Sequence, residues 1–126
     1  MLWTLWVGLG ALFAAIGVGL GAFGAHALKV RLSPEDLAIF EVGVRYQMYH
    51  ALALIGVGAV AMRLESNLVK GAGWAFVIGI LIFSGSLYAL VATGTRILGA
   101  VTPIGGVAFI AGWLMLMIAA FKAHFS

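Results

Sequence analysis

The chain has 126 residues, of which 64% are hydrophobic and only 9% are charged, and its mean hydropathy is +1.18. A soluble domain carries about a quarter charged residues, so this composition excludes an ordinary soluble protein. Seven basic and four acidic residues leave a net charge of +3. The basic residues are scattered, which argues against nucleic acid as a partner and favours contact with anionic membrane lipids. Because the chain has no cysteine, disulfides, thiolate nucleophiles and cysteine metal sites are excluded.

Four apolar segments predict membrane-spanning helices. Three of them contain uncharged runs of about 25 residues, more than the roughly 20 that a helix needs to cross the hydrocarbon core. The remaining segment, between Arg45 and Arg63, is shorter and lies near the lower limit. The predicted spans are residues 3–27, 45–63, 71–92 and 103–121. We therefore expect an all-α fold, an integral membrane antiparallel four-helix bundle, with residues 1–126 forming a single transmembrane domain.

The first span carries a stripe of small residues at helical spacing, and small residues let a second helix approach closely. The stripe predicts packing inside the bundle, with a homodimer seam as the alternative. The segment lacks a preceding basic stretch and is longer than the apolar core of a signal peptide, so we expect it to remain as an anchor. The glycines of the stripe are Gly10, Gly17, Gly21 and Gly24.

Alternating spans would place the connections on two sides of the membrane. Both termini and the connection 63–70 would share one side, called side A. The connections 29–45 and 93–102 would share the other, called side B. Because basic residues are divided almost evenly between the two sides, the orientation stays open.

The segment before the second span reads as an amphipathic helix that leads into it. Ser33 can cap the free amides, and Pro34 suits the first helical position. Glu41 precedes Arg45 by four residues, the favourable order for an ion pair on a helix. This helix is expected either to bend near Gly43 or to continue straight into the second span.

The connection before the fourth span is expected to differ from a helix. Residues 97–101 predict an extended or re-entrant stretch partly within the membrane, which requires protein or water to satisfy its backbone. Thr102 is expected to cap the fourth helix, with Pro103 at its first position.

The polar residues inside the spans fall in the side-B half. Such groups are costly in hydrocarbon unless they pair with one another or line a wet cavity. We therefore predict a polar pocket that opens to side B. The simpler interpretation is that these groups only tie helices together, with Ser86 bonding back to the carbonyl of Ile82. The candidate pocket residues are His26, Tyr46, His50, Ser84, Tyr88 and Thr102.

The residue inventory weighs against several sharper functions. The spans contain no acidic residue, whereas a proton-coupled exporter or a hydrolytic triad needs a buried carboxylate. The chain also lacks the cysteine and histidine clusters that hold zinc. We therefore expect no metal and no cofactor.

Four stretches resemble the domain of unknown function 423 family, also called the transmembrane protein 256 family. They are GLGAFGAHALK at Gly19–Lys29, YQMYHALAL at Tyr46–Leu54, FSGSLYAL at Phe83–Leu90 and GAVTPIGGVAFIAGW at Gly99–Trp113. The resemblance covers nearly the whole chain and implies a small four-helix protein of the inner cell membrane, with several spans. It supplies no established activity and no catalytic residues.

The leading function hypothesis is a non-enzymatic membrane protein that binds a lipid headgroup or a partner protein in the side-B pocket. An enzyme acting on a lipid-like substrate is the first alternative, with His50 as general base and Ser84 or Tyr88 as hydroxyl partner. The second alternative is a small channel or carrier, which would require a homo-oligomer because four helices make a thin wall.

Overall fold

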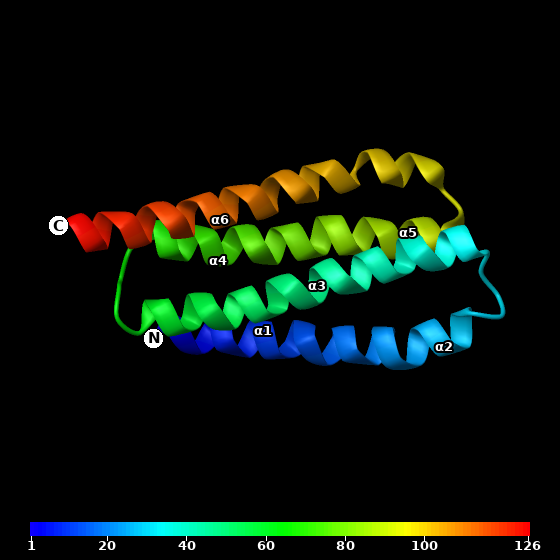
Figure 1. Ribbon diagram of the computed structural model, residues 1–126, viewed down its shortest axis with the longest axis horizontal. Coiled ribbons are helices and arrows are strands. Elements are labelled where there is room, and N and C mark those ends of the chain that lie inside the picture. Colours follow the sequence, from blue (N-terminus) through cyan, green and yellow to red (C-terminus); the bar gives the residue numbers. More distant parts are fainter.

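The computed structural model describes residues 1–126 apart from the side chain of Ala25. The chain forms four helical rods that lie side by side and alternate in direction (Figure 1). No strand occurs in the described chain, so the prediction of an all-α protein is confirmed. Both termini lie toward one end of the molecule, side A, together with the α3–α4 connection.

Two of the rods contain a π-helical segment. The first rod consists of α1 (Leu2–Gly19), the π-helical η1 (Leu20–Gly24) and α2 (Ala25–Leu28). The third consists of α4 (Asn67–Gly79), the π-helical η2 (Ile80–Ser84) and α5 (Gly85–Thr93). The second rod is α3 alone, Pro34–Ala61, and the fourth joins the 3₁₀ helix η3 (Arg96–Ala100) to α6 (Thr102–Phe125).

The rods occupy central and outer positions. The outer α1 packs against α3, and α3 packs against α4, η2 and α5 of the third rod. The other outer helix, α6, packs against α4 and η2. Figure 1 shows this order across the molecule, with α3 and the third rod between α1 and α6. Helix α3 thus contacts α1 and the third rod, and the side chain of His50 also reaches α6, which makes α3 the natural support for a site.

Three helical stretches are long and apolar enough to cross a membrane: Leu2–Leu28, Asn67–Thr93 and Arg96–Phe125. The predicted span at 45–63 covers the second part of α3 and extends two residues past its end at Ala61. The polar residues of α3 lower its hydropathy, and α3 is not among the three. The crossing of the membrane by α3 thus stays a prediction.

The amphipathic segment continues into the rest of α3 as one helix that passes Gly43 without a break. As expected, the Ser33 hydroxyl accepts a hydrogen bond from the Asp36 amide at 3.1 Å, and Pro34 opens the helix. The expected pairing of Glu41 with Arg45 does not occur. The only ion pair among the described side chains joins Asp36 to Arg96, at 2.9 Å, across the side-B connections.

Residues 97–101 differ from the prediction because most of them are helical, within η3, and not extended. The Val101 amide donates to the Leu98 carbonyl at 3.0 Å, so the segment satisfies much of its backbone internally. The expectation that Thr102 caps α6 was also wrong. Thr102 already lies inside the helix, and its hydroxyl is used by another side chain described below.

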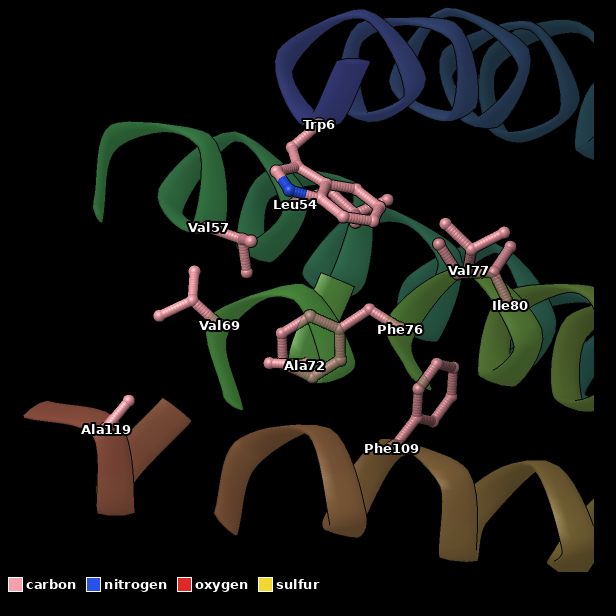
Figure 2. Close-up of a cluster of buried hydrophobic side chains, with 10 residues drawn as sticks. All are labelled: Trp6, Leu54, Val57, Val69, Ala72, Phe76, Val77, Ile80, Phe109 and Ala119. Atoms are coloured by element: carbon pink, nitrogen blue, oxygen red, sulfur yellow. The ribbon is translucent and has the colours of Figure 1, made fainter. Parts of the chain in front are cut away.

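An apolar core fills the side-A half and the middle of the molecule (Figure 2). Trp6 of α1, Leu54 of α3 and Phe76 of α4 are completely buried in it. No hydrogen-bonding partner for the indole of Trp6 lies among these apolar side chains. Ser84, Ser86 and Tyr88 of the third rod follow this core toward side B, whereas His50 stacks on Phe109 at its edge.

Candidate functional site

The buried polar groups lie on the face of α3 that looks toward the other rods. Gln47 is 3% exposed and His50 is 4% exposed, and both belong to this face because they are three residues apart. Burial of such groups is costly unless each finds a hydrogen-bonding partner. The partners of these two side chains therefore define what the site can do.

His50 has a hydrogen bond at each ring nitrogen. Nδ1 lies 2.8 Å from the Tyr46 carbonyl oxygen, and the Trp113 indole donates to Nε2 at 3.1 Å. Because an indole can only donate and a carbonyl can only accept, Nε2 carries the lone pair and Nδ1 carries the proton. The imidazole stacks on Phe109, with ring centroids 3.6 Å apart. His50 is thus a neutral ring held between α3 and α6.

Gln47 links three rods. Its amide nitrogen donates to the Phe13 carbonyl of α1 at 2.8 Å, and its amide oxygen accepts from the Tyr88 hydroxyl of α5 at 2.7 Å. The Tyr88 ring lies against α3 at Gly43, where an added Cβ would approach the ring to 2.8 Å. Glycine at this position therefore allows the close contact that brings the Tyr88 hydroxyl to Gln47.

The serines and Thr102 tie the third rod to its neighbours. Ser84, 1% exposed at the end of η2, donates to the Gly43 carbonyl at 2.6 Å. The hydroxyls of Ser86 and Thr102 lie 2.6 Å apart and join α5 to α6. Ser86 also bonds back along its own helix, at 2.9 Å, but to the carbonyl of Phe83 and not to that of Ile82.

The six predicted pocket residues are distributed over separate contacts. Ser84 and Tyr88 both reach the stretch of α3 that includes Gly43, and Tyr46 meets His50 through its backbone carbonyl. The Tyr46 ring is 37% exposed and packs on Phe83, 4.7 Å between centroids.

Two predicted pocket residues lie apart from that central stretch. Thr102 pairs with Ser86, as described above. His26 is exposed on α2 and has no hydrogen bond to a described side chain.

The four predicted packing glycines belong to the first rod, and all of them face α3. An added Cβ at Gly10 would meet the Ala51 carbonyl oxygen at 2.6 Å, and one at Gly17 would meet the Met48 sulfur at 2.5 Å. The contacts at Gly21 and Gly24 are with the side chains of Val44 and Phe40, at 3.2 and 3.1 Å. In the single chain, the stripe is thus covered by α3.

Two residues that hold the site together were missed from sequence. Gln47 lies three residues before His50, and this spacing on one helix face was the available signal. Trp113 was not among the candidate residues, yet its indole donates to His50. No local pattern could have found that contact, because it depends on the rotation and register of α6 against α3.

The two side chains considered for catalysis, His50 and Ser84, are already engaged in hydrogen bonds. A base must have a free lone pair within reach of a proton, but the His50 lone pair accepts from Trp113. The Ser84 hydroxyl, one of the two hydroxyl partners considered for His50, donates to a backbone carbonyl. Within the described residues, no group of three or more histidine and carboxylate side chains could hold a metal ion.

Comparison with known proteins adds the family. A protein-family model described as "Protein of unknown function (DUF423)" matches residues 20–106. The chain belongs to this family. The matched part of this DUF423 member contains Gln47, His50, Ser84 and Tyr88, whereas the partner Trp113 lies beyond it. No solved structure matches the chain.

Several curated relatives are named "UPF0382 membrane protein". One from Staphylococcus haemolyticus is 52% identical over 118 residues, covering 94% of this chain and 96% of the relative. Another from Staphylococcus epidermidis is 54% identical over 114 residues, which cover 90% of this chain and 93% of the relative. The Bacillus subtilis protein YwdK is 50% identical over 115 residues, which cover 90% of this chain and 94% of the relative. This DUF423 member is therefore similar to membrane proteins over most of its length.

Proposed function

We propose that this DUF423 member is a non-enzymatic, multi-pass protein of the inner cell membrane that binds an anionic lipid headgroup at its side-B surface. All four rods would cross the bilayer as an antiparallel bundle and form a single transmembrane domain. The internal hydrogen bonds of Gln47, His50, Ser84 and Tyr88 would then hold the bundle together near one leaflet.

The observation that carries this proposal is the division between paired and unpaired polar groups. The buried polar side chains bond to one another or to backbone carbonyls, so a ligand must use the exposed groups around them. Arg45 is exposed and has no carboxylate within 4.0 Å. Guanidinium groups bind phosphate oxygens in a fork geometry that suits a phospholipid headgroup.

Two tyrosines beside Arg45 suit the membrane interface. Tyr46 and Tyr49 are 37% and 53% exposed, and their ring centroids lie 5.6 Å apart. Tyrosine places an apolar ring against acyl chains and a hydroxyl among headgroups, which is why it is frequent at that depth. Lys29 and Arg31, both exposed in the preceding connection, add positive charge at the same end.

The enzymatic alternative is weaker on the same grounds. For His50 to act as a base, the Trp113 indole would have to leave Nε2 and become an unsatisfied donor. The observed pairing gives no reason for such a change. A channel or carrier would need an assembly of several copies, and nothing in the single chain favours one.

The test is to replace Arg45 by Gln and measure lipids retained in native mass spectra, after purification from nanodiscs that mix anionic and zwitterionic phospholipids. A basic group near an anionic surface contributes about 1 kcal/mol, so we expect roughly fivefold less anionic lipid. Arg63→Gln removes the same charge at side A and serves as the control.

Equal lipid retention by the Arg45→Gln and unaltered proteins would refute the headgroup site. Loss of a co-purified protein in place of lipid would instead assign the surface to a protein partner, the other occupant that fits an exposed arginine flanked by tyrosines.

A further inference from the structure

A cavity of about 440 Å³ opens at side A, between the ends of α1, α3 and α4. Apolar side chains form much of its wall, including Trp3 and Ala61, and Val69 of α4 is almost completely buried beside it. Glu65 and Lys70 are exposed at its mouth. Its volume lies in the range of small-molecule sites, roughly 300–1,000 Å³.

Trp6 lines this cavity and carries the only buried side-chain nitrogen or oxygen without a hydrogen-bonding partner among the described residues. Buried indole N–H groups usually have a partner, and leaving one unpaired costs about 1–3 kcal/mol. Because Trp6 is 0% exposed, bulk water does not supply this partner. A ligand group that enters the cavity and displaces the side chains at its inner end would supply it.

The direction of the Trp6 ring is fixed by its neighbours. One face lies over Gly73, where an added Cβ would come within 2.8 Å of the ring, and Trp74 meets the ring nearly edge-on, at 5.1 Å between centroids. Figure 2 shows the indole nitrogen on the side of the ring toward Val57 and Val69, the end of the molecule where the cavity lies. The unpaired N–H therefore points toward the cavity.

The surroundings of this donor select an uncharged ligand. An anion beside Trp6 would be buried among apolar side chains without a cation in contact, at a large desolvation cost. At the mouth, the charge of Glu65 offsets that of Lys70, and the terminal amino group belongs to Met1, which is 93% exposed and therefore hydrated. A carbonyl oxygen accepts a hydrogen bond without carrying a charge, and an apolar tail suits the wall.

We propose that the side-A cavity binds a neutral amphiphile through a carbonyl group that accepts a hydrogen bond from Trp6 Nε1. A quinone ring and the ester of an uncharged acyl lipid share this chemistry. The site does not rest on the headgroup surface proposed at side B, because the two lie at opposite ends of the molecule and recognise ligands of different charge.

The experiment follows the indole N–H resonance of Trp6 in the ¹⁵N-labelled protein in nanodiscs. The probes are a decyl-tailed benzoquinone, a decanoyl glycerol ester and decylbenzene, which has the same tail without a carbonyl. We expect a saturable downfield shift with at least one carbonyl probe and none with decylbenzene. The responding probe tells a quinone source from an ester source.

Variants separate the hydrogen bond from the cavity. Trp6→Phe keeps an aromatic ring over Gly73 but removes the donor, and we expect it to weaken binding of the responding probe about tenfold, as measured by equilibrium partition. Trp113→Phe removes an indole donor on α6, away from the cavity lining and from the Trp6 ring, and serves as the control. Ala61→Leu fills the cavity from α3 while it leaves Trp6 in place, and we expect it to abolish the shift.

Two results would overturn this site. The first is the absence of a saturable shift with every probe while the Trp6 N–H exchanges with water, since this would show that the cavity holds water alone. The second is equal binding by Ala61→Leu and the unaltered protein. Neither depends on whether Arg45 retains anionic lipid, so failure here is distinguishable from failure of the side-B proposal.

Discussion

At the scale of single residues, His50 shows how a buried polar side chain acts as a structural link. Its two nitrogens face one donor and one acceptor, so a single tautomer satisfies both bonds, and its ring fills the space against Phe109. The chemistry that sequence alone suggested for this residue, proton transfer, needs the lone pair that Trp113 occupies.

Replacing His50 by Ala should destabilise the protein by about 2–3 kcal/mol, because the Trp113 N–H loses its acceptor and the ring leaves a void. The measurement is reversible unfolding in mixed detergent and dodecyl sulfate micelles. A double-mutant cycle with Trp113→Phe should give a coupling energy of about 1 kcal/mol. His124→Ala, at an exposed position, should change stability by less than about 0.5 kcal/mol. Strict additivity in the cycle would contradict the assigned hydrogen bond.

At the scale of elements, the α1–α3 contact depends on glycines in α1. An added Cβ at Gly10 would lie 2.6 Å from the backbone oxygen of Ala51, whereas one at Gly8 would meet nothing within 4 Å. The two positions are one half-turn apart on the same helix, so they face opposite directions. Only the Gly10 face is closed by α3.

Gly10→Ala should therefore destabilise the protein by about 1–3 kcal/mol, since a backbone atom cannot move aside as a flexible side chain can. Gly8→Ala should leave stability unchanged or raise it by up to about 1 kcal/mol, because alanine favours the helix. The same unfolding measurement compares the two variants. If both substitutions change the free energy of unfolding equally, Gly10 is not needed for the close approach of α1 to α3.

At the scale of the whole molecule, the open question is whether α3 crosses the bilayer with the other rods. Its polar residues lower its hydropathy, but Gln47 and His50 are turned inward and paired. A helix whose polar groups are satisfied by its neighbours can cross a membrane that its composition alone would not favour.

Single cysteines test this topology, since the natural chain has none. With four crossings, labels at Glu65→Cys and Ser126→Cys should react from one side of sealed vesicles, and labels at Lys29→Cys and Thr95→Cys from the other. The readout is blocking by a membrane-impermeant maleimide. If Lys29→Cys groups with Glu65→Cys, α3 does not cross.

The sequence by itself determined the local features of this protein. Hydropathy marked the apolar helices, and the Ser33–Pro34 start of α3 followed from capping chemistry, because both depend on residues close together in the chain. The 3₁₀ helix η3 was missed because the same residues are compatible with both a 3₁₀ helix and an extended backbone.

Only the tertiary structure decided which polar groups meet. His50 accepts a hydrogen bond from Trp113, 63 residues away in the sequence, and Ser84 donates to the carbonyl of Gly43, 41 residues away. These pairings depend on the rotation and register of packed helices, which hydropathy does not encode. The same holds for Trp6, because the contact of its side chain with Gly73 and Trp74 of α4 leaves its N–H buried beside a cavity.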